Sequence, residues 1–168
     1  MRGGYDGNMA HTYHQNLGHL IFHTGGCIVR NDDLVRLHGY IAGVAERIGI
    51  KHPIVGGTGN HIHLLGNFPV SHAVAELVSK IKASSSHWMK GVHSRYRSFA
   101  WQQGYAYYSV SYSMYNIVEK YIATQKRHHT HMSTEEAFRL LLEKHALLQP
   151  GAPESSGGTP NDSPPPCV

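Results

Sequence analysis

The stretch IKHPIVGGTGNHIHLLGNF, residues 50–68, carries two apolar segments joined by a glycine-rich turn. Apolar runs bounded by turn residues predict a β-hairpin, here with one strand over 50–56 and the next over 60–68. Successive side chains of a strand point to opposite faces, so His61 and His63 share one face and Ile62 points to the other. Two imidazoles so placed can share one metal ion, although with 15 His in 168 residues such a pair also arises by chance.

The segments before the hairpin predict one strand and one helix. Residues 16–24 are apolar in the middle and end at a Gly25-Gly26 turn, which indicates a first strand. Asn31-Asp32 can cap a helix that Gly49 ends, because the apolar residues between them recur at helical spacing.

After the hairpin, Ser71 is expected to cap a helix that runs to about Gly91. Aromatic and small residues alternate over 105–111 as a fourth strand, Ser113 opens a third helix, and Ser133 begins a last one. The order strand, helix, strand, strand, helix, strand is that of ferredoxin-like folds. We therefore expect an α+β, ferredoxin-like (RRM-like) domain, whose four-stranded antiparallel sheet has helices on one side and a free face on the other.

The chain length of 168 residues fits one domain. Composition divides it into a flexible Gly-rich leader over 1–10, a folded domain over 11–147 and a disordered Pro/Gly/Ser-rich tail over 148–168. No apolar run approaches the roughly 18 residues that cross a bilayer, and the N-terminus lacks a secretory signal pattern. We therefore expect a cytoplasmic protein with no membrane partner.

Basic residues concentrate in the second half of the predicted domain. Residues 80–127 contain eight Lys or Arg and one acidic residue, Glu119, although the net charge of the whole chain is only +4. This distribution favours a polyanionic partner, nucleic acid first, while a solvated helix face is the alternative. The residues predicted to contact DNA are Lys82, Lys90, Arg95, Arg97, Lys126, Arg127, His128 and His129.

The third predicted helix places a second set of polar side chains on one face. Tyr121 and Gln125 are four residues apart and are therefore neighbours on the helix surface. The Gln125 oxygen, with the imidazoles of His61 and His63, would suit Mg²⁺ or Mn²⁺ better than a thiolate zinc site does. Such a metal would polarise a phosphodiester, and Tyr121 could attack its phosphorus to form a phosphotyrosine. A polar surface stripe is the alternative interpretation of this helix.

Four motifs, in order along the chain, resemble those of one known family: GNHIHLL (59–65), KASSSHW (82–88), WQQGY (101–105), and YIATQ (121–125) followed by His128-His129. The family is the single-tyrosine HUH transposases of the insertion sequence 200/605 type, with their REP-associated relatives. The resemblance extends over roughly residues 14–142, which is nearly the whole predicted domain. The His-x-His pattern alone is a weak signal, but four motifs at family spacing are a strong one.

The resemblance implies a metal-dependent DNA strand transferase that cleaves and rejoins single-stranded DNA at the ends of a mobile element. Tyr121 would be the nucleophile that takes the 5′ phosphate, and His61, His63 and Gln125 would hold the Mg²⁺ or Mn²⁺ ion. It further implies a homodimer with composite sites, recognition of DNA hairpins near the element ends and no nucleotide cofactor. The expected localisation is cytoplasmic, in association with the nucleoid of a bacterial or archaeal cell.

The chain departs from the family pattern at Asn60, where Asp is usual, and in the aromatic strand over 105–111. Neither change removes a predicted ligand or the nucleophile, so we expect an active enzyme. A host-domesticated REP-associated or relaxase-like HUH endonuclease would share this chemistry. The alternative that is not an enzyme is a non-catalytic module, which binds single-stranded nucleic acid by stacking bases on exposed aromatics of the sheet.

Overall fold

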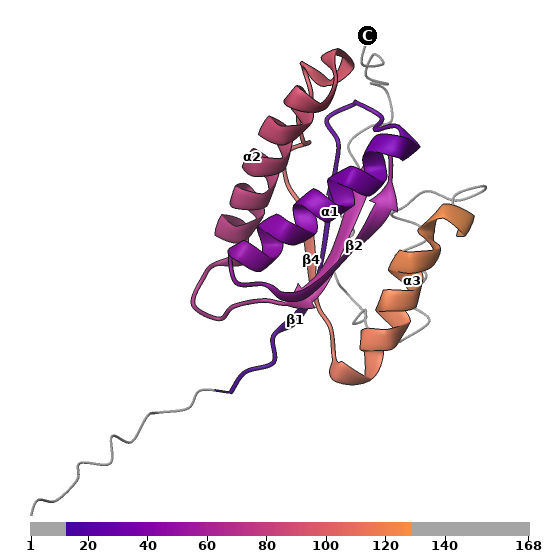
Figure 1. Ribbon diagram of the computed structural model, residues 1–168. Coiled ribbons are helices and arrows are strands. Elements are labelled where there is room, and N and C mark those ends of the chain that lie inside the picture. Colours follow the sequence, from indigo (N-terminus) through magenta and orange to yellow (C-terminus); the bar gives the residue numbers. More distant parts are fainter. Residues whose placement is uncertain (1–12, 129–168) are drawn as a thin grey trace, which may run out of the picture.

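The computed structural model describes residues 13–128, and their elements follow the predicted order (Figure 1). Four strands form one antiparallel sheet in the order β2-β3-β1-β4, so the α+β ferredoxin-like prediction is confirmed. The bounds of the elements are β1 (Leu17–His23), α1 (Asn31–Arg47), β2 (Lys51–Thr58), β3 (His61–Asn67), α2 (Val74–Val92), η1 (Ser94–Tyr96), β4 (Ala106–Ser109), η2 (Tyr112–Met114) and α3 (Tyr115–His128).

Strand β3 lies at the centre of the sheet, between β2 and β1. The pairing of β3 with β1 places His23 opposite His61 and Ile21 opposite His63. The pairing of β3 with β2 places Thr58 opposite His61, so Gly59 and Asn60 alone form the hairpin turn. This register fixes the predicted His pair in the interior of the sheet, at the end where β1 stops and β3 begins.

The two faces of the sheet carry separate apolar clusters. Leu20, Phe22, Ile62 and Leu64 belong to the larger cluster, which is shared with α1 and α2. The opposite face carries the smaller cluster, which consists of Leu17, Leu65, Val110, Val118 and Ile122. Alternation along β1 and β3 therefore gives each face its own core.

Helix α3 accounts for the second cluster, because it packs against β2 and β3 on the face that lacks α1 and α2. In Figure 1, α1 and α2 lie next to each other, and α3 stands apart from them beside β2. The expectation that the helices lie on one side thus holds for α1 and α2, whereas the supposedly free face is partly covered by α3. The burial of β3 on both faces, over residues 61–66, is the local reason, since a strand buried on both sides needs a cover on each.

The predicted helix starts are wrong by a few residues. Helix α1 follows Arg30 and α2 follows Ala73, and neither start has a side-chain cap. Ser71 bonds to the ring of His72 instead of capping α2, and a short η2 turn precedes α3 where Ser113 was expected to open it. Gly49 does end α1, with a φ of +95° that favours glycine.

Three further predictions lie outside the described residues: the leader over 1–10, the helix expected from Ser133 and the tail over 148–168. Within residues 13–128, no helix is both long enough and apolar enough to cross a membrane.

Helix α3 lies directly against the backbone of β2 at Gly56. A Cβ atom there would lie 2.5 Å from Cγ2 and 3.0 Å from the carbonyl oxygen of Ile122. We therefore expect Gly56→Ala to push α3 away and to lower the free energy of unfolding by about 1–3 kcal/mol. Thermal unfolding measures the change.

Gly91 provides the matched control, because a Cβ atom there would have no neighbour within 4 Å. Gly91→Ala lies in α2 and should leave stability unchanged or raise it slightly. Equal stability of Gly56→Ala and the wild type would mean that α3 does not pack on β2 as described.

Candidate active site

The predicted His pair and the predicted nucleophile meet on one face of the sheet, within one chain. His61 and His63 are fully buried on β3, with ring centroids 4.9 Å apart and ring planes perpendicular. The ring of Tyr121, from α3, lies edge-on to His63 with centroids 5.6 Å apart. Helix α3 brings Tyr121 there because Val118 and Ile122, on the same side of the helix, pack into the smaller apolar cluster.

His61 is held through its Nδ1 atom by the hairpin turn. Nδ1 lies 2.8 Å from Oδ1 of Asn60 and 2.9 Å from Oγ1 of Thr58, and the Thr58 hydroxyl donates to Asn60 Oδ1 at 2.6 Å. Since the amide oxygen can only accept, the arrangement places a hydrogen on Nδ1 of His61. Asn60, which stands where the family usually has Asp, thus supplies an acceptor oxygen without a charge. A metal ion on this ring would bind through Nε2.

His63 is held through its Nδ1 atom as well, but by another imidazole. Nε2 of His19, on β1, lies 2.9 Å from Nδ1 of His63, and the two rings stack with centroids 5.0 Å apart and planes 23° apart. His19 is fully buried, and this burial lowers its pKa to about 3, so its ring is neutral at physiological pH. A metal ion on His63 would again bind through Nε2.

The sequence analysis did not identify His19 or His23 as part of this site. His23 is partly buried directly opposite His61, with ring centroids 5.7 Å apart. The signal that could have found both residues is the alternation in residues 17–23, which puts His19, Ile21 and His23 on one face. What it could not give is the pairing of that strand with β3.

The His pair fits a divalent metal ion, because imidazole is a common metal ligand and both Nδ1 atoms are engaged within the protein, so that Nε2 of each ring is the atom that would bind. Among residues 13–128, no three His, Cys, Asp or Glu side chains gather closely enough to form a site by themselves. Within the part of the chain that the structure describes, a third ligand of these four types is therefore absent. The predicted one, Gln125, lies on α3 one turn beyond Tyr121, but its side chain is outside what the structure describes.

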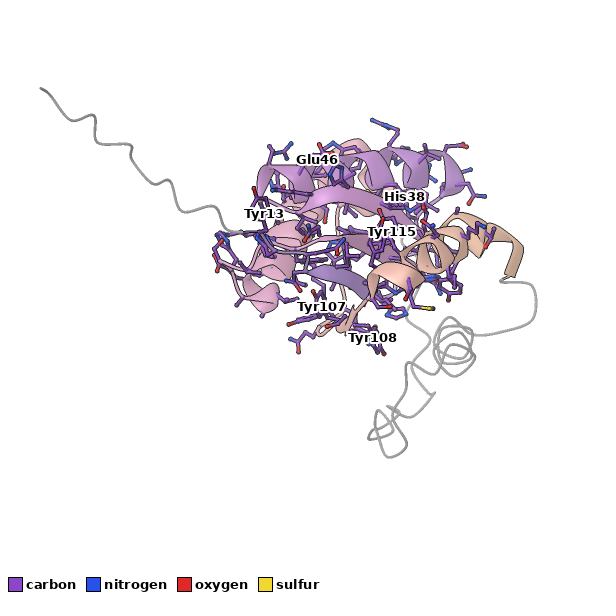
Figure 2. All side chains as sticks on the ribbon, turned by 90° about the horizontal axis from the view of Figure 1, so that it is seen from below. Tyr13, His38, Glu46, Tyr107, Tyr108 and Tyr115 are labelled. Carbon is purple, nitrogen blue, oxygen red and sulfur yellow. The ribbon has the colours of Figure 1, made fainter. Side chains whose placement is uncertain are left out.

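Three other tyrosines of the described residues, Tyr107, Tyr108 and Tyr115, occupy different surroundings. Tyr107 of β4 points to the α1 and α2 side, where it packs edge-on to Phe68 and where burial raises its pKa. Tyr108 pairs with His19 across the β1–β4 ladder, and Tyr115 lies in the first turn of α3 (Figure 2). Burial, followed by the nearby Glu119 carboxylate, raises the pKa of Tyr115, which opposes formation of a phenolate.

The predicted DNA-binding residues separate into three groups. The Lys82 ammonium donates to the backbone carbonyls of Gln102, at 2.9 Å, and Gly104, and burial lowers its pKa, so it tethers the loop before β4. Lys90 and Arg97 are exposed at the end of α2 and just after η1, with the partly buried Arg95 between them. For Lys126, Arg127 and His128 only the backbone of α3 is described, and His129 lies outside the described residues.

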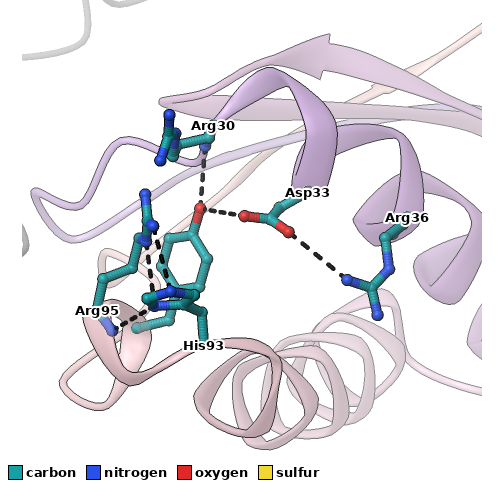
Figure 3. Close-up of polar contacts among 6 residues, drawn as sticks. Arg30, Asp33, Arg36, His93 and Arg95 are labelled. Carbon is teal, nitrogen blue, oxygen red and sulfur yellow. Dashed lines mark hydrogen bonds and ion pairs between the residues drawn. The ribbon is translucent and has the colours of Figure 1, made fainter.

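A polar network joins the end of α2 to the start of α1 (Figure 3). The Tyr96 hydroxyl accepts from the backbone N–H of Arg30 at 3.1 Å and donates to Asp33 at 2.8 Å. Arg95 lies over the Tyr96 ring and donates from Nε to Nδ1 of His93 at 3.2 Å. Arg30 and Arg95 meet in this network, and Lys90, in the last turn of α2, and Arg97, at the end of η1, are near Arg95 in the chain. We name these four residues the basic end.

The basic end lies at the same end of the sheet as the His pair. The loop between β1 and α1 connects them, because Thr24 donates to the carbonyl of Asn60 and Val29 donates to that of Gly59, each at 2.8 Å.

Comparison with known proteins adds three findings. The structure resembles that of a candidate transposase from Deinococcus radiodurans R1, with a TM-score of 0.53 and 18% identity over 74% of this chain and 98% of that one. It also resembles a REP-associated tyrosine transposase bound to a REP hairpin, with a TM-score of 0.51 and 13% identity over 73% of this chain and 74% of that one. These similarities concern the fold alone, and a search of curated proteins finds no match.

The family model for IS200-like transposases matches residues 17–125. The matched range begins at the first residue of β1, contains the His pair and Tyr121, and ends at Gln125. It therefore takes in every element that builds the site described above, and on this match the chain belongs to the IS200-like transposase family.

Proposed function

We propose that the protein cleaves and rejoins single-stranded DNA at the ends of an insertion sequence, through a 5′-phosphotyrosine on Tyr121. The observation that carries the proposal is the contact between the Tyr121 ring and His63, on the face that also carries His61. A tyrosine, which can act as a nucleophile, thus lies beside two imidazoles, which can hold a metal ion. His61, His63 and Gln125 are the proposed ligands of a Mg²⁺ or Mn²⁺ ion.

The proposed reaction exchanges one phosphate ester for another. The phenolic oxygen of Tyr121 loses its proton and attacks the phosphorus, the bond from phosphorus to the 3′ oxygen breaks, and that oxygen leaves as a 3′ hydroxyl. Attack by a 3′ hydroxyl on the phosphotyrosine reverses the step, so rejoining needs no nucleotide cofactor. A bound metal ion would supply charge neutralisation at the phosphate.

The test of the proposed function is formation of a covalent adduct between the protein and DNA. Labelled single-stranded oligonucleotides that carry a palindrome and its flank, taken from both sides of the gene, are incubated with the protein and Mn²⁺ or Mg²⁺. We expect an adduct on denaturing gels that is absent in excess chelator. An adduct of equal yield with and without chelator would contradict the role of the metal ion.

The geometry also supports a site in which Tyr121 and the His pair come from the same subunit of the proposed homodimer, because Tyr121 contacts His63 of its own chain. We therefore expect that mixed dimers of Tyr121→Phe and His63→Ala subunits form no adduct, since no single chain then keeps both groups. Coexpression with two different tags isolates these dimers for the cleavage assay.

The control for that experiment is a mixed dimer of wild-type chains with chains that carry both substitutions, which should retain activity. Recovery of cleavage in the dimer of single variants would instead show that the tyrosine of one subunit serves the His pair of its partner.

We propose that the basic end binds a DNA hairpin, as its positive charge and its position beside the His pair favour a polyanion. Among the proteins of similar fold, the REP-associated tyrosine transposase has a structure in which it is bound to a REP hairpin. The double variant Lys90→Ala/Arg97→Ala should weaken hairpin binding and reduce the slope of log affinity against log salt by about two. Binding titrations at several salt concentrations measure this slope.

Lys51→Ala is the matched control, because Lys51 is exposed at the opposite end of β2. It removes a positive charge and should leave the salt slope unchanged. Equal slopes for the double variant and the wild type would place the hairpin elsewhere on the protein.

The non-catalytic alternative receives no support from the sheet. It requires exposed aromatics on the two middle strands, whereas the α3 side of β1 and β3 carries His19, Ile21, His23, His61 and His63. A domesticated or relaxase-like endonuclease would use the same residues, and its distinction from a transposase rests on the DNA sites that the protein cleaves.

A further inference from the structure

His19 is a buried polar side chain that the proposed reaction does not use. It lies at the middle of the sheet with no exposed surface, between Leu17 and Ile21 on the same side of β1. Burying an imidazole among such neighbours is unfavourable unless its polar atoms are bonded. The bond at 2.9 Å to Nδ1 of His63 is the specific contact that justifies a histidine here.

The orientation of His63 depends on this contact. An imidazole can rotate about two side-chain torsions and can carry its proton on either nitrogen. Which nitrogen faces a metal ion is decided by the hydrogen bond that the other nitrogen makes. Stacking with His19 and the bond to His19 Nε2 together restrict both the plane of the His63 ring and its direction.

His61 is held in the same way as His63, through its Nδ1 atom. There, too, Nδ1 is bonded within the protein, to Asn60 and Thr58. The two rings of the pair thus use the same nitrogen for their internal contacts, although their partners come from different strands and have different chemistry. This agreement argues that the His19–His63 contact serves the pair and is not merely a way of filling the core.

We propose that His19 is a positioning residue, which accepts the Nδ1–H of His63 at its own Nε2 and so fixes the tautomer in which Nε2 of His63 binds a divalent metal ion. The inference rests on the proposed function, because it takes His63 to be a metal ligand. His19 itself neither binds the metal nor touches DNA.

The tautomer is measured in the metal-free protein by long-range ¹H–¹⁵N correlation NMR of its histidine rings. In the wild type we expect His63 to carry its proton on Nδ1. In His19→Leu, which keeps most of the volume but has no acceptor, the proton should redistribute between the two nitrogens. A wild-type His63 that carries its proton on Nε2 would overturn the proposal, even if His19→Leu does not fold.

Mn²⁺ titration of the same proteins gives the second readout. We expect His19→Leu to weaken Mn²⁺ binding by about 10–100-fold. His19→Gln, whose amide oxygen can accept the same hydrogen bond, should restore most of the affinity. The matched control is His87→Leu, because His87 is an exposed histidine on α2. It should bind Mn²⁺ as the wild type does.

The outcomes separate this inference from the proposed function. Wild-type Mn²⁺ affinity and an unchanged His63 tautomer in a folded His19→Leu protein would overturn the positioning role and leave the proposed function intact. If instead the wild-type protein binds no Mn²⁺, alone or with its DNA, the metal-dependent function fails and the inference fails with it, although the tautomer can still be as expected.

Discussion

Replacement of Tyr121 by phenylalanine is expected to abolish the covalent protein–DNA adduct and to reduce cleavage roughly a thousandfold or more, because it removes the nucleophilic oxygen. The phenyl ring can keep the edge-on contact with His63 and the position of α3. Folding and metal binding should therefore be unchanged. The measurement is adduct formation on denaturing gels, with Mn²⁺ affinity and thermal unfolding followed in parallel.

Tyr115→Phe is the matched control for this variant. Tyr115 lies on the same helix and packs against the same apolar cluster, but it is six residues before Tyr121. This substitution should leave adduct formation close to that of the wild type. If Tyr121→Phe keeps its adduct while Tyr115→Phe loses it, the assignment of the nucleophile is wrong.

Replacement of His63 by alanine is expected to abolish Mn²⁺ binding and cleavage while hairpin binding persists. The substitution removes one proposed ligand, whereas the basic end lies on other elements, namely α2, η1 and the start of α1. It also deprives His19 of a buried hydrogen bond, which should cost about 1–3 kcal/mol of stability. Metal titration, cleavage and hairpin binding are measured at a temperature where the variant is folded.

His72→Ala is a suitable control, because His72 is exposed in the turn before α2 and bonds only locally to Ser71. It should match the wild type in all three assays. Simultaneous loss of cleavage and hairpin binding in a folded His63→Ala protein would mean that the His pair supports the structure and does not hold a metal ion.

Local sequence patterns were sufficient to predict the order of strands and helices along the chain and the shared face of His61 and His63. The alternation around His61 and His63 and the glycine-rich turn at Gly59 are signals within a few residues of one another. The i,i+4 spacing of Tyr121 and Gln125 was sufficient to nominate one face of α3. The structure adds that Tyr121, on this face, contacts His63 of the same chain.

Contacts between distant segments could not be predicted in this way. His19 lies 44 residues from His63 in the chain, and only the register between β1 and β3 brings them together. From the sequence, Lys82 is indistinguishable from other basic residues on a helix. In the structure its ammonium donates hydrogen bonds to two carbonyls of the loop before β4, which are 20 and 22 residues away in the chain. The second apolar cluster under α3 has the same origin, since its members come from four different parts of the chain.

The substitution of Asn for the usual Asp at position 60 illustrates the limit of motif comparison. From the sequence alone, it removes the carboxylate that is usual beside the first His of the pair. In the structure the Asn60 oxygen accepts a hydrogen from His61 at 2.8 Å and a second one from Thr58 at 2.6 Å. The acceptor function depends on an oxygen at that position and not on its charge, which only the geometry of the turn could establish.

The most direct test of the central claim is to locate the residue that carries DNA after cleavage. The wild-type adduct is digested with protease and nuclease, and the modified peptide is sequenced by mass spectrometry. We predict a 5′-phosphate on Tyr121, within the peptide of α3. A phosphate on any other residue, or a linkage through the 3′ end of the DNA, would contradict the account.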